Sequence, residues 1–265
     1  MNSKQKEWIK NIAKLGYAAK GIVYFITGAL TAAYALNMGG KKSSSTESLQ
    51  FINTLTGGKF LLGVIGTGLL CYSVWRIIMA VRDTEEEGTS AKGTGKRIAF
   101  AFSGLLYGSL AFASFKYISG TGSSSNGSNE KAITSKLLDL PFGKWLVILV
   151  GLITIGNGIY QIIKGVSGKY MKDISGLEAD KRNALRKAGK VGFISRGIVF
   201  SIIGFLFVKA GWLHSASTAE GTSGAFSFLQ TWPYGSWLLA AVAIGLMAYG
   251  FFMFVQAKYS NISIS

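Results

Sequence analysis

Two short landmarks occur three times along this chain, and their repetition constrains the fold more than any other feature. The first landmark reads KGIVY at Lys20–Tyr24, SGLLY at Ser103–Tyr107 and RGIVF at Arg196–Phe200. The second reads GKFL at 58–61, GKWL at 143–146 and GSWL at 235–238. The two landmarks recur after 83 and 85 residues, and then again after 93 and 92 residues. A shared period of this kind predicts tandem structural modules.

Each copy contains two apolar segments that are long enough to cross a membrane. Five stretches contain no Lys, Arg, Asp or Glu: 21–40, 60–75, 98–115, 145–163 and 237–257. A transmembrane helix needs about 20 apolar residues. The sixth stretch is uncharged only over 197–208, and it spans 191–212 if Arg196 and Lys209 snorkel to opposite interfaces. The sequence therefore predicts an all-α integral membrane protein with six transmembrane helices.

The landmarks divide the chain into segments with different expected roles. We expect an N-terminal interfacial helix at 1–19, repeat 1 at 20–83, repeat 2 at 95–170, a cytoplasmic linker helix at 171–190 and repeat 3 at 191–260. Within the linker, Ser175 and Glu178 have the spacing of a capping box. Gly/Ser-rich connections at 39–45, 119–129 and 215–224 are each followed by a short apolar stretch that we expect to be helical.

Every two-helix unit enters and leaves on the same side, so the three units are parallel. Parallel repeats predict a pseudo-threefold axis along the membrane normal. Of the 28 basic residues, 20 fall in the segments 1–20, 76–97, 164–196 and 258–265. This excess places both termini in the cytoplasm by the positive-inside rule. We therefore attribute the net charge of +16 to membrane topology and to contact with anionic lipid at the cytoplasmic face. Nucleic acid is not an expected partner.

The residue types needed for catalysis are missing from the predicted spans. All twelve acidic residues lie outside the cores of these spans, and His214 and Cys71 are the single histidine and cysteine. Ion-coupled carriers commonly use an ionisable group inside the membrane. With one histidine and one cysteine, neither a catalytic triad nor a metal site can be assembled. We therefore expect a non-enzymatic protein without a metal or a cofactor.

Small residues recur at matching positions in the first helix of each repeat. They are Gly21 and Gly28, Gly104 and Ala111, and Gly197 and Gly204. Residues seven apart lie on one face of a helix. Because small residues let helix backbones approach closely in lipid, we expect these positions to form helix contacts.

Polar positions in the second helices are candidates for lining a cavity. The repeats align Tyr72 with Asn157 and Tyr249, and Arg76 with Gln161 and Met253. In each helix the two positions are four residues apart and share a face. Tyr72, Arg76, Asn157, Gln161 and Tyr249 could therefore line the cytoplasmic half of a central cavity, with Arg76 recognising an anion. Alternatively, Arg76 snorkels to the interface, and Asn157 with Gln161 bonds a neighbouring helix.

The segments Gly16–Tyr24, Gly68–Arg76 and Gly192–Phe200 carry a recurring aromatic, basic and glycine pattern. This pattern resembles the domain-of-unknown-function family numbered 1206, and the likeness covers nearly the whole chain as three modules. The middle copy is the most divergent, with Asn157 and Gln161 in place of tyrosine and arginine. The resemblance implies a bacterial membrane protein and supplies no catalytic residues.

Two functions are consistent with these features. The first is an accessory, scaffold or lipid-binding subunit of the bacterial inner membrane that acts with a membrane-protein partner. The alternative is a passive channel or uniporter for a small solute, an anion among the candidates, through a central threefold cavity.

Overall fold

Six long helices dominate the computed structural model, which describes residues 3–82, 91–122, 128–172 and 174–260. They are α1 (Ser3–Ala35), α3 (Gly58–Arg82), α4 (Ala91–Ile118), α6 (Gly143–Ser167), α7 (Ala179–Trp212) and α9 (Gly235–Tyr259). Each contains a segment that is long and apolar enough to cross a membrane. The prediction of an all-α protein with six membrane-spanning helices is confirmed.

Short helices connect the long helices within each repeat. They are α2 (Ser45–Asn53), α5 (Ser128–Leu138) and α8 (Thr222–Gln230), and the 3₁₀ turns η1 (Lys169–Met171) and η2 (Ala216–Thr218) lie elsewhere. The short helices follow the three Gly/Ser-rich connections, as predicted, although 123–127 lie outside the described residues. A capping box starts α2, because Ser44 Oγ accepts the Glu47 N–H at 3.2 Å and the Glu47 carboxylate accepts the Ser44 N–H at 2.6 Å.

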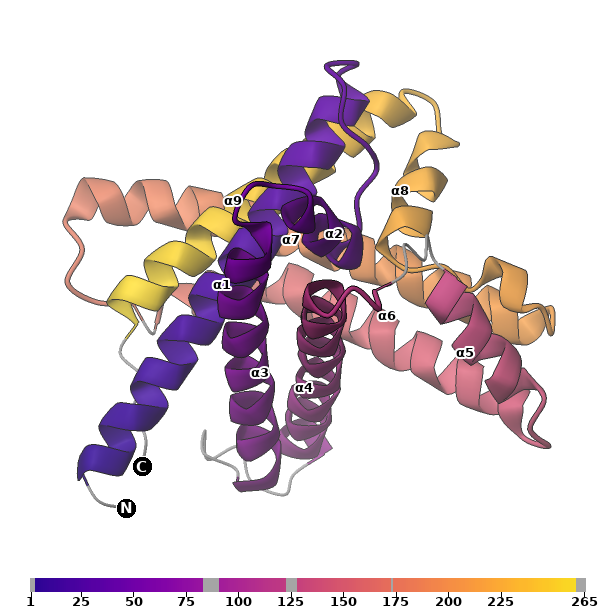
Figure 1. Cartoon of the computed structure of the whole chain (residues 1–265), viewed down its shortest axis with the longest axis horizontal. Coiled ribbons are helices and arrows are strands. Elements are labelled where there is room, and N and C mark those ends of the chain that lie inside the picture. Colours follow the sequence, from indigo (N-terminus) through magenta and orange to yellow (C-terminus); the bar gives the residue numbers. More distant parts are fainter. Residues whose placement is uncertain (1–2, 83–90, 123–127, 173, 261–265) are drawn as a thin grey trace.

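The long helices pack mainly across repeat boundaries. The most extensive contacts join α3 to α4, α6 to α7 and α9 to α1, so the second helix of each repeat packs on the first helix of the next in cyclic order. Figure 1 shows these three pairs as separate arms. Helices α1 and α3 also pack together, as do α7 and α9, whereas α4 and α6 are not among the packed pairs of the described residues. The pairing of the helices is cyclic, but the second repeat is more open than the others, and the pseudo-threefold axis stays a prediction.

The small residues expected to form helix contacts lie between the paired helices. A Cβ atom added to Gly28 or Gly204 would lie 2.6 Å from a backbone carbonyl oxygen of α9 or α6. A Cβ atom added to Gly21 would lie 3.0 Å from the Gly250 carbonyl oxygen. One added to Gly104 would lie 2.7 Å from the Ile77 side chain, and one added to Gly197 would lie 2.7 Å from the Gly158 carbonyl oxygen. Ala111 is 1% exposed. At these positions a larger side chain would push the paired backbones apart.

Two of the predicted segments are parts of longer helices. The expected interfacial helix at 1–19 runs without a break into the first span as α1, and α7 joins the end of the predicted linker helix to repeat 3. The predicted capping box at Ser175 is wrong, because α7 starts after Glu178 and has no side-chain cap. Instead, the Ser175 N–H donates to the Tyr259 carbonyl at 3.4 Å, which holds this segment against the end of α9.

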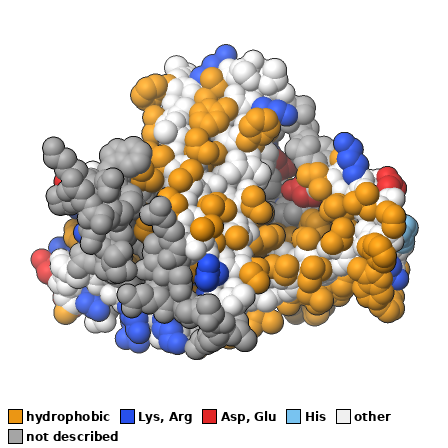
Figure 2. All heavy atoms as spheres, turned by 90° about the horizontal axis from the view of Figure 1, so that it is seen from below, with side chains coloured by type: hydrophobic (Ala, Val, Ile, Leu, Met, Phe, Trp, Pro, Cys, Tyr) orange, Lys and Arg blue, Asp and Glu red, His pale blue; other side chains and the backbone are white. Residues whose placement is uncertain are grey.

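Exposed aromatic residues mark one end of the helix bundle. The third residue of the second landmark is Phe60, Trp145 or Trp237, and these side chains are 80%, 63% and 72% exposed. They lie at the starts of α3, α6 and α9, next to the short helices, and we call this end the α2–α5–α8 side. Aromatic residues are enriched where a membrane meets water. Hydrophobic side chains are spread over the face shown in Figure 2, as contact with lipid requires.

Candidate functional site

Two basic side chains are buried inside the bundle. Lys20 on α1 and Arg196 on α7 are the first residues of the first landmark in repeats 1 and 3, and they are 3% and 5% exposed. The prediction that Arg196 snorkels to an interface is wrong, because its guanidinium packs against tyrosines of α1 and α9. A buried charge within a membrane span is costly, so such a residue marks a candidate functional site.

Arg196 donates hydrogen bonds to tyrosines on three other helices. Its Nε donates to the Tyr24 hydroxyl at 2.9 Å, its Nη1 to Tyr249 at 3.0 Å and its Nη2 to Tyr107 at 3.2 Å. The planar guanidinium has a fixed fan of donors, so one side chain can fix three hydroxyls at once. Arg196 therefore links α1, α4 and α9 around α7.

Lys20 occupies the same cluster and mainly faces aromatic rings. Its Nζ donates to the Tyr72 hydroxyl at 3.3 Å. The same nitrogen lies 4.9 Å from the ring centroids of Tyr72 and Tyr107 and 5.2 Å from that of Tyr249. These distances are in the range of cation–π attraction. We call Tyr24, Tyr72, Tyr107 and Tyr249 the tyrosine cage.

The triplication generates the tyrosine cage and also limits its symmetry. Tyr24 and Tyr107 hold the same position of the first landmark, and the third copy has Phe200 there. Tyr72 and Tyr249 hold the same position in the second helices of their repeats, and the middle repeat has Asn157 there. Ser103 stands where repeats 1 and 3 have Lys20 and Arg196, and it is 7% exposed. The cage thus holds two cations where three identical repeats would place three.

No carboxylate balances these two cations in the described part of the chain. The ion pairs found there join Lys131 to Glu220 and Lys181 to Glu178, both away from the cage. Burying a charge costs several kcal/mol, by order of magnitude, unless a partner compensates it. The hydroxyls and rings of the cage solvate the cations partly but bring no negative charge.

Hydrogen-bond donors are also in excess within the cage. The Tyr24 hydroxyl oxygen accepts from Arg196 Nε and from the Tyr107 hydroxyl at 3.3 Å, so its own proton remains to be donated. Lys20 uses one of its three N–H groups in the hydrogen bond to Tyr72. Positive charge and spare donors together are suited to an anion.

A small cavity adjoins Arg196 and Tyr24 toward the α2–α5–α8 side. Its volume is about 20 Å³, and it is also lined by Thr27, Ser45 and Thr222. A volume of this order accommodates one water-sized species. We call this cavity the neck.

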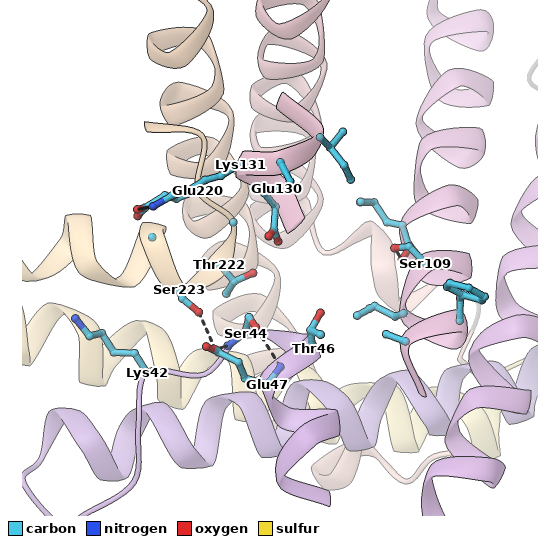
Figure 3. Close-up of a pocket in the computed structure, with 18 of the residues that line it drawn as sticks. Lys42, Ser44, Thr46, Glu47, Ser109, Glu130, Lys131, Glu220, Thr222 and Ser223 are labelled. Atoms are coloured by element: carbon cyan, nitrogen blue, oxygen red, sulfur yellow. Dashed lines mark hydrogen bonds and ion pairs between the residues drawn. The ribbon is translucent and has the colours of Figure 1, made fainter. Parts of the chain in front are cut away.

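A larger cleft, which we call the vestibule, lies next to the neck. Its volume is about 870 Å³, and it lies between the end of α4, the start of α2, α5 and the start of α8. Thr222 lines both cavities, and Ser45 of the neck is flanked by Ser44 and Thr46 of the vestibule. Figure 3 shows Glu47 between these elements, where its carboxylate accepts the Ser223 hydroxyl at 2.8 Å. This bond joins α2 to α8 beside the neck.

The opposite side of the cage is closed by aromatic packing. The Tyr17 ring lies 5.6 Å from the Tyr72 ring, and the Phe193 ring lies 5.1 Å from that of Tyr249. Phe193 in turn packs on Tyr170 and Phe252. We call Tyr17, Tyr170, Phe193 and Phe252 the aromatic floor, and it faces the predicted cytoplasmic side.

The structure brings only two of the five predicted cavity residues, Tyr72 and Tyr249, into the cage. The Arg76 guanidinium carbon lies 5.4 Å from the Tyr72 ring centroid and 4.7 Å from that of Phe100, beside the cage. Gln161 donates to Asn157 at 3.5 Å within α6, which packs on α7. Sequence reasoning missed Lys20, Tyr24, Tyr107 and Arg196, although all four stand in the first landmark. Within the described residues, no cluster of metal-binding side chains is found.

The fold and the site together define a class of six-helix membrane protein in which three two-helix repeats enclose a pair of buried cations. The model of the family Domain of Unknown Function (DUF1206) matches residues 15–83, 98–168 and 191–260, and the chain belongs to this family. It is 33% identical over 260 residues to "Uncharacterized protein YxxB" of Bacillus subtilis (strain 168), covering 97% of this chain and 94% of the relative. No solved structure matches the chain. The family resemblance seen in the sequence is confirmed, with its three modules.

Proposed function

We propose that this protein is a non-enzymatic membrane protein that binds a small anion beside Lys20 and Arg196. The observation that carries the proposal is the burial of two cations without a carboxylate partner in the described residues. A bound anion would offset the cost of burying them. It would also accept the spare N–H and O–H donors of the tyrosine cage.

The shape of the site favours binding from one side over free conduction. The vestibule and the neck support entry from the α2–α5–α8 side, which the predicted topology assigns to the non-cytoplasmic face. The neck has room for a halide-sized ion and would exclude a large organic anion. The aromatic floor blocks the other side, which argues against a permanently open channel. We therefore favour an anion-binding subunit over the passive channel.

The proposal predicts that small anions stabilise the protein against heat. Purified protein in lipid nanodiscs should show a higher melting temperature in sodium fluoride, chloride or formate than in sodium gluconate at equal ionic strength. A ligand at 100 times its Kd stabilises a protein by about 2.7 kcal/mol. The Arg196→Gln variant removes the central donor set, and we expect it to have the same melting temperature in all four salts.

Lys209→Gln is the matched control, because Lys209 is an exposed lysine on the same helix. This variant should keep the full anion response of the wild type. The proposal fails if the wild type melts at one temperature in every salt, or if Arg196→Gln responds like the wild type. Rapid chloride flux in proteoliposomes that Arg196→Gln abolishes would instead support the channel.

A further inference from the structure

The length of the vestibule along the predicted span of α4 equals the thickness of one membrane leaflet. Its lining on α4 runs from Leu106 to Lys116. Ten residues of α-helix rise about 15 Å. The hydrocarbon core of a bilayer is about 30 Å thick, so each leaflet contributes about half of this depth. The vestibule therefore extends from the end of α4 to the level of the tyrosine cage, since Leu106 is next to Tyr107.

The two walls of the vestibule differ in character. Leu106, Leu110 and Phe112 on α4, with Ile133 on α5, form an apolar wall. Phe112 and Ile133 are 64% and 60% exposed, so this wall is not covered by other parts of the described chain. Polar residues of α2, α5 and α8 form the other wall (Figure 3). A cleft with this division is suited to a molecule that has both a chain and a polar head.

The charges of the polar wall favour a negative head. The acidic residues that line the vestibule are Glu47, Glu130 and Glu220, and the lysines are Lys42, Lys131, Lys136 and, at the end of α4, Lys116. Glu220 is paired with Lys131 at 2.7 Å, and Glu47 is engaged by Ser44 and Ser223. The other three lysines have no ion-pair partner among the residues that the structure describes. Against the carboxylates of Glu47 and Glu130, these three lysines leave an excess of one positive charge in the vestibule.

The apolar wall of the vestibule is exposed at the surface of the described chain, because Phe112 and Ile133 are largely uncovered. The long helices α4 and α6 are not packed together in the described part of repeat 2, unlike those of repeats 1 and 3. Figure 2 shows a hollow with acidic side chains inside it, on a face where hydrophobic side chains predominate. A lipid could enter such an opening sideways from the membrane without leaving the bilayer.

We infer that the vestibule holds one anionic phospholipid from the leaflet on the α2–α5–α8 side. Its phosphate lies near Lys116 and Lys136, and one acyl chain lies along the apolar wall of α4. This inference is independent of the anion proposed at Arg196, because none of the residues that carry it belongs to the tyrosine cage. The phosphate stays in the vestibule, since the neck has a volume of only about 20 Å³.

Native mass spectrometry of the full-length protein in mild detergent tests this inference. With equimolar phosphatidylglycerol and phosphatidylcholine of identical chains, the wild type should retain one phosphatidylglycerol with about tenfold preference or more, since each lysine near a lipid phosphate contributes about 1 kcal/mol. The double variant Lys116→Gln with Lys136→Gln should bind both lipids equally. Ala113→Trp, which fills the chain wall, should retain neither lipid.

Control variants make the same kinds of substitution, lysine to glutamine and a side chain to tryptophan, at positions outside the vestibule. Lys59→Gln at the start of α3 and Leu152→Trp on α6 are both at exposed positions and should leave lipid retention unchanged. Equal retention of both lipids by the wild type overturns the inference, as does an unchanged preference in the double lysine variant. Arg196→Gln should still retain phosphatidylglycerol, so failure of the anion proposal is distinguishable from failure of this one.

Discussion

A variant in which aspartate replaces Ser103 is expected to lose its response to added anions. Ser103 is buried and occupies the position that Lys20 and Arg196 hold in the other repeats, one helical turn before Tyr107 of the cage. An aspartate there would supply the negative charge that the cage lacks. In sodium gluconate the variant should be more stable than the wild type by about 1–3 kcal/mol, because a fixed ion pair replaces an uncompensated buried charge.

Thermal unfolding in nanodiscs measures this effect in gluconate and in chloride. Ser109→Asp provides the control, because it adds the same charge on the same helix at the vestibule wall. That control should keep the anion response of the wild type. If Ser103→Asp is stabilised by chloride as strongly as the wild type, the buried cations are not the site at which chloride acts.

Gly204→Leu should produce a large loss of stability. A Cβ atom at this position would lie 2.6 Å from the Gly151 carbonyl oxygen of α6, which is backbone and cannot rotate away. Overpacking a tight core costs about 1–3 kcal/mol for a few added methylenes, and more where the backbone must move. We expect a cost above about 3 kcal/mol, because α6 and α7 would have to separate.

Gly156→Leu is the matched control for this substitution. Gly156 lies on α6, the helix that packs on α7, but a Cβ atom added there would have no heavy atom within 4 Å. Substitutions at exposed positions usually change stability by about 0.5 kcal/mol or less. The melting temperatures of the two variants in one detergent give the comparison, and equal losses would show that the close approach at Gly204 contributes no stability.

The architecture was predictable because the repeats, the spans and the small residues each leave a pattern in the sequence. The landmarks at Gly21 and Gly58 recur in step, and each copy lies in or beside a long apolar stretch. Helix boundaries were harder to predict. Ser175, shortly before α7, donates its N–H to the carbonyl of Tyr259, which is far away along the chain, and no local capping pattern reports such a contact.

The buried cations were missed because an isolated cation at the edge of an apolar stretch has two interpretations. Lys20 and Arg196 each lie where charge gives way to a span, which is where snorkelling lysines and arginines are found. At Lys20 the signal that distinguishes the two is the tyrosine four residues later. Tyr107 holds the same position after Ser103, whereas Arg196 is followed there by Phe200. Aromatic hydroxyls on the same helix face as a cation indicate a polar interior.

The polar residues of the middle repeat were predicted to line a cavity, but the structure places them outside the tyrosine cage. Asn157 and Gln161 align with Tyr72 and Arg76 in sequence, which suggested a shared cavity. Alignment gives equivalent positions in equivalent repeats, but α4 and α6 are not packed together as the helices of the other repeats are. Gln161 and Asn157 bond to each other within α6, and the second helices that contribute to the cage are those of repeats 1 and 3, through Tyr72 and Tyr249.

The cyclic pairing of helices has a consequence for the order in which the protein is made. During synthesis α3 meets α4 and α6 meets α7 as neighbours along the chain, but α1 must wait for α9, which emerges after the other five long helices. Until then the glycine face of α1 and the ammonium of Lys20 lack their partners on α9. The nascent protein thus passes through a stage with an open seam beside a charged residue, and arrival of α9 both closes the ring and shields the cation from lipid.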